Sequence, residues 1–196
     1  MNTKIKVGIF LFNEVEVLDF AGPFEVFSLA EKDGEKIFDV ITIGEHQHTI
    51  SARNGLIVQP NTTFENCPKL DILIIPGGYG AEKIEINNPK TLQWIKEQYT
   101  KVDLLTSVCT GAFLLAECRL LDNKEATTHW MDLDFLEKTY PEVKVQRDVK
   151  FVEDGDIISS GGISAGIHMS FHIVKKLFGR EIAAQTAKRM EYDIKL

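Results

Sequence analysis

The sequence is poor in cysteine, in basic runs and in long apolar stretches, and each shortage excludes a class of protein. Its three cysteines, Cys67, Cys109 and Cys118, are odd in number and lack a Cys-x-x-Cys spacing, so we expect neither a disulfide framework nor a zinc ribbon. No run of Lys and Arg exceeds two residues and the net charge is −7, which argues against a nucleic-acid-binding surface. No stretch has transmembrane length and no signal-peptide pattern is present, so we expect a cytoplasmic protein that contacts no membrane.

The composition is that of an ordinary globular chain. A length of 196 residues and a hydrophobic content of 44% are enough for one α/β domain over residues 1–196. Apolar runs typical of buried strands alternate with helical patterns, and the main strand candidates are residues 4–12, 38–44, 71–75 and 102–106. This alternation predicts a doubly wound, mostly parallel sheet with helices on both faces, a flavodoxin-like three-layer sandwich.

Residues 106–113 are the most informative stretch. Cys109 lies where the strand candidate 102–106 meets an apolar, helix-forming run at 111–116, and small residues, Ser107 and Gly111, stand on either side. This pattern follows the Gly-x-Ser-x-Gly logic of a nucleophile elbow, a strained turn that presents a reactive side chain. The alternative is a small buried hydrophobe, as free cysteines usually are, but the setting favours a nucleophile. N–H groups at a helix start favour the anion, so we expect this position to lower the pKa of Cys109.

Four segments, taken in order, resemble one family. They are LDFAGPFEVF, IIPGGYG, SVCTGAFLLAECRLLDNKEATTHW and SSGGISAGIHMSFHIV. Together they resemble the ThiJ/PfpI superfamily of class I glutamine-amidotransferase-like proteins. Within it, the nearest resemblance is to the isonitrile hydratase branch and to the amidotransferase-like sensor domains of AraC-type regulators. The resemblance covers nearly the whole chain.

Asp19 is the candidate partner of the cysteine. Within residues 15–30 the sequence predicts a helix whose first turn holds Pro23, and this places Asp19 in the loop before that helix. The loop lies at the carboxyl edge where open parallel sheets bind ligands. A helix cap is the structural alternative. The resemblance implies more, because the isonitrile hydratase branch carries an acidic residue here that contacts the cysteine. An ionised Asp19 would raise the pKa of Cys109 and a protonated one would donate to the thiolate, and both states stay open.

Thr110 and Gly78 are expected to supply backbone donors. Protease-like and amidase-like members of the superfamily carry histidine where this chain has Thr110, and a cysteine protease needs an imidazole base beside its thiol, so peptidase chemistry is disfavoured. Gly77 and Gly78 allow a close backbone approach after the strand at 71–75. We therefore expect the N–H groups of Gly78 and Thr110 to form an oxyanion-type hole.

The histidines and the second glycine pair complete the candidate pocket. His129 is a proton-shuttle candidate or a structural residue at a helix start, where Thr128 is the expected cap. Gly162 opens the helix expected over residues 164–178, and His168 replaces the acidic residue of the family pattern. His168 and His172 are spaced i, i+4, but without a Glu between them in a His-Glu-x-x-His pattern we expect no metal site.

The sequence thus favours a cofactor-free enzyme of the isonitrile hydratase type, which adds water to an isonitrile to give an N-substituted formamide. Cys109 would attack the terminal carbon and Asp19 would manage the proton. A non-catalytic small-molecule sensor domain is the alternative from another class, and an amidase or a stress-related thiol enzyme of the same superfamily is a third. The expected partners are a small molecule and a second copy of the chain, as a homodimer.

Overall fold

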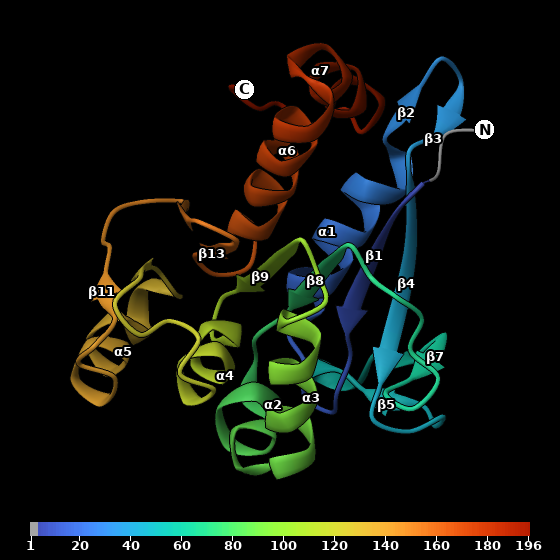
Figure 1. The fold of residues 1–196 in the computed structure, drawn as a ribbon. Coiled ribbons are helices and arrows are strands. Elements are labelled where there is room, and N and C mark those ends of the chain that lie inside the picture. Colours follow the sequence, from blue (N-terminus) through green and yellow to red (C-terminus); the bar gives the residue numbers. More distant parts are fainter. Residues whose placement is uncertain (1–3) are drawn as a thin grey trace.

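The computed structural model describes residues 4–196, and a seven-stranded sheet forms its centre (Figure 1). The strand order is β12-β13-β9-β8-β1-β4-β7. The strands are β1 (Ile5–Phe10), β4 (Phe38–Gly44), β7 (Thr62–Thr63), β8 (Ile72–Ile75), β9 (Leu104–Val108), β12 (Phe151–Asp154) and β13 (Ile157–Ser160). Every pairing is parallel except that of β12 with β13. The predicted doubly wound, mostly parallel sheet is confirmed.

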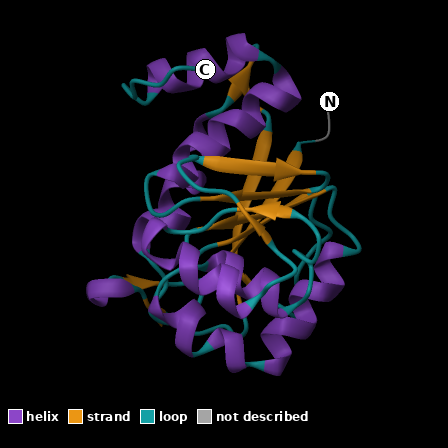
Figure 2. Cartoon of the chain, turned by 90° about the vertical axis from the view of Figure 1, so that its left-hand side faces the viewer, coloured by secondary structure: helices purple, strands orange, loops and turns teal. Residues whose placement is uncertain are grey.

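Helices lie on both sides of this sheet (Figure 2). They are α1 (Val17–Leu29), α2 (Tyr79–Lys83), α3 (Pro89–Tyr99), α4 (Gly111–Glu117), α5 (Leu133–Thr139), α6 (Ala165–Phe178) and α7 (Arg180–Arg189). One group joins α1, α6 and α7, and another joins α2, α3 and α4. Both faces of β8 and β9 are therefore covered, which explains why both strands are buried throughout. Strand β8 reads as an unbroken apolar run, whereas β9 also carries the buried polar residues Thr106 and Ser107.

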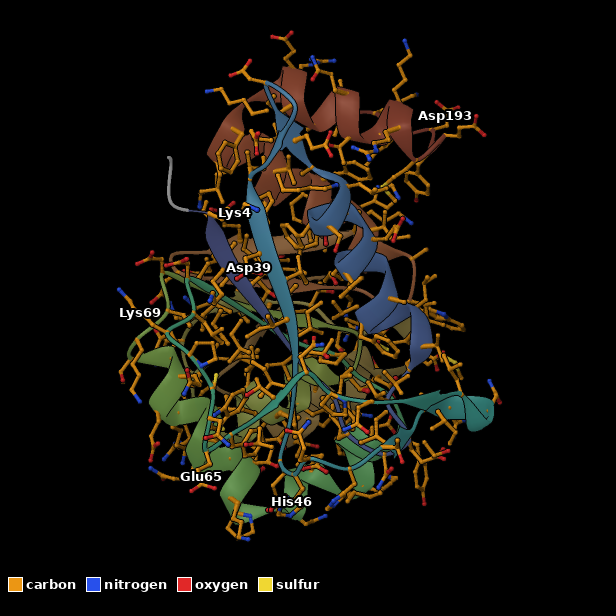
Figure 3. The ribbon with its side chains drawn as sticks, turned by 90° about the vertical axis from the view of Figure 1, so that its right-hand side faces the viewer. Lys4, Asp39, His46, Glu65, Lys69 and Asp193 are labelled. Atoms are coloured by element: carbon orange, nitrogen blue, oxygen red, sulfur yellow. The ribbon has the colours of Figure 1, made fainter. Side chains whose placement is uncertain are left out.

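Short elements complete the chain. Three small sheets pair β2 (Glu31–Lys32) with β3 (Glu35–Lys36), β5 (Ile50–Ser51) with β6 (Ile57–Val58) and β10 (Glu125–Ala126) with β11 (Lys144–Val145). Single 3-10 turns cover η1 (Arg53–Gly55), η2 (Glu85–Asn87) and η3 (Trp130–Asp132). Figure 3 shows Lys4 at the amino end of the sheet and His46, just beyond β4, at the carboxyl end. No helix within residues 4–196 combines the length and the apolarity that a bilayer crossing requires.

Three local predictions were wrong. Helix α1 begins at Val17, so Asp19 lies inside its first turn and not in the preceding loop, and Pro23 is an interior residue of the helix. Proline has no N–H, so the carbonyl of Asp19, four residues earlier, loses its helical partner at this point. Thr128 is not a helix cap, because its hydroxyl donates to the carbonyl of Cys109 at 2.8 Å. Helix α2, directly after Gly78, had no clear sequence signal.

The approach of α4 to β8 requires glycine at position 111. A Cβ added at Gly111 would lie 2.1 Å from the backbone carbonyl oxygen of Ile75, so the main chain itself would have to move. We expect Gly111→Ala to lower the free energy of unfolding by about 1–3 kcal/mol, the usual range for overpacking. Gly161→Ala is the matched control, because its Cβ would meet its nearest neighbour at 3.6 Å. Urea unfolding measures both, and equal losses for the two variants would contradict the steric account.

Candidate active site

Cys109 occupies a strained turn between β9 and α4. Its φ is 57°, in the left-handed region that non-glycine residues rarely adopt. The turn is held from several sides: the N–H of Cys109 donates to the carbonyls of Ser160 and Gly161, each at 3.2 Å, and Thr128 bonds its carbonyl. Strain that surrounding contacts impose on one residue is typical of functional sites. The predicted elbow conformation is confirmed.

Asp19 connects three distant segments around the cysteine. Its side chain is fully buried. The carboxyl oxygen Oδ2 accepts the N–H of Gly77 at 3.0 Å, and Oδ1 accepts the N–H of Ile163 at 3.1 Å. The carboxyl group also lies close enough to the Cys109 thiol for each of the two groups to shift the pKa of the other. A helix cap would bond N–H groups of its own helix, so Asp19 is placed as a partner of the cysteine and of two loops.

The carboxyl and the thiol both hold their protons more tightly than usual. The pKa of Asp19 is raised to about 7, chiefly by burial and also by the negative charge of Glu16, while the N–H groups of Gly77 and Ile163 oppose the rise. Burial also raises the pKa of Cys109 strongly, and the charge of Asp19 adds to it, while the N–H of Thr110 works in the opposite direction. The expectation that the helix start lowers the pKa of this thiol was wrong, because desolvation and the neighbouring carboxylate outweigh the backbone dipoles.

The expected oxyanion donors are arranged differently from the prediction. The N–H of Gly78 donates to the side-chain oxygen Oγ1 of Thr110 at 3.0 Å, and the N–H of Gly77 is bound to Asp19. Of the two predicted donors, Thr110 therefore directs its N–H at the sulfur, and Gly78 instead fixes the Thr110 side chain. The glycines are needed for this approach, since a Cβ at Gly77 would lie 2.5 Å from the backbone nitrogen of Thr110.

A cavity of about 320 Å³ opens beside the cysteine. It is lined by Glu16, Arg53, Gly78, Tyr79, Glu82, Cys109, Thr110, His129, Met131, Asp132 and Ile163. Thr110 and Cys109 line this cavity, and both residues are buried. This volume suits a small molecule more than a folded peptide segment.

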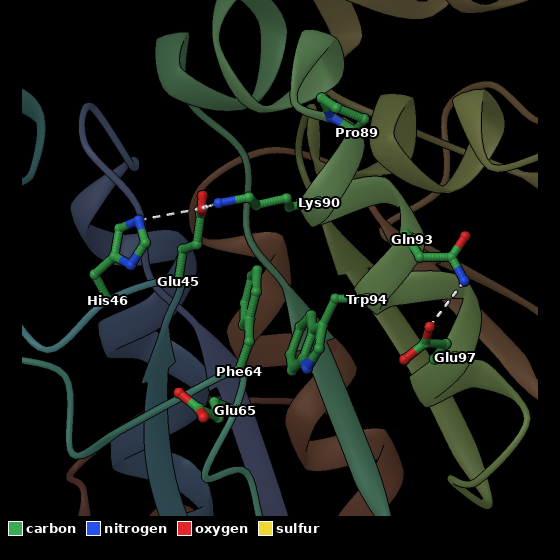
Figure 4. Close-up of a pocket in the computed structure, with 9 residues that line it drawn as sticks. All are labelled: Glu45, His46, Phe64, Glu65, Pro89, Lys90, Gln93, Trp94 and Glu97. Atoms are coloured by element: carbon green, nitrogen blue, oxygen red, sulfur yellow. Dashed lines mark hydrogen bonds and ion pairs between the residues drawn. The ribbon is translucent and has the colours of Figure 1, made fainter.

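A larger cavity lies elsewhere on the chain (Figure 4). It has a volume of about 630 Å³ and contains a stacked pair, Phe64 and Trp94, whose ring centroids are 4.1 Å apart. Glu45 forms ion pairs there with His46 at 3.2 Å and with Lys90 at 3.4 Å. No cysteine lines this cavity. We therefore place the chemistry at the smaller cavity, which holds the strained thiol and its carboxyl partner.

The structure separates the predicted pocket histidines. His129 lines the cavity, and its ring lies on Gly162, where an added Cβ would meet the ring at 2.0 Å. The His129 nitrogen Nδ1 accepts the N–H of Met131 at 3.4 Å and lies 3.4 Å from a carboxylate oxygen of Asp132. His168 is not among the cavity-lining residues, which corrects its placement in the pocket. It faces the C-terminal segment, 3.2 Å from the hydroxyl of Tyr192.

Sequence reasoning missed several cavity residues. Ile163 stands out, because it is β-branched and holds a φ of 55° while its N–H binds Asp19. Nothing in the sequence marks a left-handed isoleucine. Tyr79 and Glu82 come from the unpredicted helix α2, and Arg53 comes from the turn between β5 and β6. An Asn-Gly pair such as the one after Arg53 is typical of a tight turn, but it gives no sign of which cavity the turn faces.

The fold and the elbow together define a class: a doubly wound α/β protein that presents a cysteine at the carboxyl edge of its sheet. The DJ-1/PfpI family profile matches residues 5–176. The chain is also 34% identical to an isonitrile hydratase of Pseudomonas putida over 189 residues, which are 96% of this chain and 78% of that protein. The chain belongs to the DJ-1/PfpI family.

Other relatives include regulators and solved structures. The chain is 25% identical to the HTH-type transcriptional regulator GbdR of Pseudomonas aeruginosa, over 95% of this chain but 50% of the regulator, so it spans about half of that relative. A THiJ/PfpI family protein from Pseudomonas syringae superimposes with a TM-score of 0.88 at 24% identity, covering 99% of this chain and 77% of that one. Drosophila melanogaster DJ-1beta superimposes with a TM-score of 0.85 at 18% identity, and the match covers 98% of this chain and 100% of the Drosophila chain.

Proposed function

We propose that the protein is a cysteine-dependent hydratase that adds water to an isonitrile and releases an N-substituted formamide. The observation that carries the proposal is the pairing of Cys109, in its strained turn, with Asp19, whose pKa is raised to about 7. A carboxyl group with that pKa exists in both protonation states near neutral pH, as a residue that takes and returns a proton must. The similarity to the isonitrile hydratase of P. putida supports the same substrate class.

The reaction can be written with this pair alone. The sulfur of Cys109 bonds to the terminal carbon of R–N≡C, and the thiol proton, carried by Asp19, ends on that carbon to give the thioimidate R–N=CH–S–Cys. Water then adds to the same carbon with Asp19 as general base, the C–S bond breaks, and the thiol regains its proton. The product R–N=CH–OH rearranges to the formamide R–NH–CHO. The N–H of Thr110 stabilises negative charge at the sulfur in both steps.

A small-molecule sensor is the second candidate. Two observations favour it. The first is that the regulator GbdR resembles 95% of the length of this chain. The second is that burial raises the pKa of Cys109, which keeps the thiol protonated at rest. An amidase has less support, because the imidazole of His129 lies near Asp132 and Met131, and Thr110 stands beside the thiol where such enzymes carry histidine.

An activity screen separates these candidates. Wild type and Cys109→Ala are offered isonitriles, amides and α-oxoaldehydes, and the formyl proton of a formamide product is followed by NMR. We expect turnover of an isonitrile by wild type only. Turnover of amides or α-oxoaldehydes alone would move the protein to another branch of the family. Binding of an isonitrile with an unchanged rate of hydration over buffer would favour the sensor.

We also propose that the protein works in the cytoplasm as a homodimer, as we expect of a small-molecule enzyme of this family. The expected result of multi-angle light scattering is a mass of twice 22.1 kDa. A mass of one chain at tens of micromolar protein would refute the dimer.

A further inference from the structure

The cavity beside Cys109 carries an excess of negative charge. Three carboxylates line it, on Glu16, Glu82 and Asp132, against one guanidinium, that of Arg53. Arg53 is already paired, because its Nη1 lies 3.0 Å from a carboxylate oxygen of Glu14. The positive charge that the wall contributes is therefore balanced by a neighbour, while the three carboxylates remain to act on whatever enters.

Two of these carboxylates have no cationic partner in the described part of the chain. Glu16 and Glu82 are both partly buried, yet neither forms an ion pair with a Lys, Arg or His of residues 4–196. Some partly buried carboxylates elsewhere do have such partners: Glu45 is paired with Lys90, and Asp39 with Lys6. An unpaired, half-desolvated carboxylate is unfavourable in the empty cavity and becomes favourable when a cation binds beside it.

An aromatic ring lies on the same wall. Tyr79, at the start of α2, is 48% exposed and lines the cavity next to Glu82. The guanidinium carbon of Arg53 stands 5.9 Å from the centre of this ring, so the face of Tyr79 already lies near a cation. Aromatic faces beside carboxylates are the usual surroundings of bound ammonium groups.

We propose that the Cys109 cavity selects a small substrate that carries an alkylammonium group, with the cation held between Glu16, Glu82 and the ring of Tyr79 and the electrophilic end against the thiol. The proposal names the substrate class of the site described above and rests on Cys109 being its reactive group. Asp132, beside His129, also lines the cavity and adds to its negative potential. Anionic molecules of the same size are excluded by repulsion.

Charge-matched thiol reagents test this without any substrate. Three methanethiosulfonates are used: a trimethylammonioethyl, a neutral ethyl and a sulfonatoethyl reagent. Each forms a mixed disulfide with the thiol and releases methanesulfinate. The rate at Cys109 is read at mildly alkaline pH by peptide mass spectrometry and divided by the rate for a free small thiol. Reaction at Cys67 is separated by its own peptide.

We expect the cationic reagent to outpace the anionic one at Cys109 by about tenfold or more beyond the ratio for the free thiol. The double variant Glu16→Gln, Glu82→Gln should lose most of that preference. Glu25→Gln, on an exposed position of α1, is the control for net charge and should keep the preference. Equal normalised rates for the three reagents in wild type, or an equal loss of preference in the control variant, would overturn the proposal, as would failure of all three reagents to reach Cys109.

The proposed hydratase activity is judged separately, from formamide production by a matched pair of isonitriles, one with a trimethylammonium group and one with a tert-butyl group in its place. Hydration of both without preference would overturn the charge selection and leave the hydratase standing. A cationic preference in the reagent experiment without any hydration would overturn the hydratase and leave the charge selection standing.

Discussion

Asp19→Asn is expected to reduce the turnover of an isonitrile by about 100-fold or more, the scale on which loss of a general acid or base acts. Asparagine has nearly the same shape but cannot carry a proton between sulfur, carbon and water. The pH profile gives a second reading. Wild-type turnover should show an apparent pKa near that of Asp19, which is raised to about 7, and the profile of the variant should lack it. Asp39→Asn, at a surface carboxylate paired with Lys6, is the control.

The same variant has an unusual expected effect on stability. A carboxyl whose folded pKa of about 7 exceeds its usual 3.8 contributes stability that is fully present below about pH 4 and is lost as pH rises through about 7, in total roughly 4 kcal/mol. Asparagine removes this dependence. The N–H groups of Gly77 and Ile163 both need an acceptor, but asparagine offers only one oxygen, so one of these two N–H groups would face the side-chain NH₂ group. This loss should lower the free energy of unfolding by about 1–3 kcal/mol.

Asp19→Asn should therefore be less stable than wild type in acid, and the deficit should shrink or reverse in mild alkali. Urea unfolding at about pH 4 and about pH 8 measures this change. A deficit that is constant with pH would show that Asp19 does not titrate with a raised pKa. The thiol gives an independent check, because removing the charge of Asp19 should lower the pKa of Cys109 and speed its alkylation by iodoacetamide.

Cys109→Ala is expected to abolish hydration, with a loss of at least about 10³-fold, because no other group in the cavity can form the thioimidate. Fold stability should change little, since the residue is small and its backbone contacts remain. Cys118→Ala is the matched control: this cysteine is also buried, and its thiol donates to the carbonyl of Leu92 at 3.4 Å. It should lose stability and keep turnover. Equal turnover in both variants would remove Cys109 from the mechanism.

The fold was predictable because its strongest signals are local. Strand-like runs rich in β-branched and apolar residues mark β4 and β8 almost to the residue, and the small residues around Cys109 predicted the elbow. A parallel sheet then brings the carboxyl ends of β1, β8 and β9 together, which placed Asp19 and Cys109 at one edge. The start of α1 was misjudged because proline is most common in a first turn, and here Pro23 is tolerated six residues later than the helix start.

The chemistry of the site was less predictable, because it depends on contacts across long separations in the chain. Whether a helix start or burial governs the pKa of Cys109 depends on which groups desolvate the thiol, and the sequence cannot rank them. The same holds for Gly78, whose N–H was free in the sequence argument and is bound to Thr110 in the structure. The left-handed conformation of Ile163, 144 positions from Asp19, leaves no local signal.

The central claim is that an isonitrile becomes covalently attached to Cys109 before water releases the formamide. Mass spectrometry of protein mixed with an alkyl isonitrile and quenched within the first turnover tests it most directly, in wild type and in Asp19→Asn, where slower hydrolysis should let the adduct accumulate. The expected result is a mass increase equal to one whole isonitrile, mapped to the Cys109 peptide and absent in Cys109→Ala. Formamide production with an unmodified Cys109 peptide in both proteins would contradict the account.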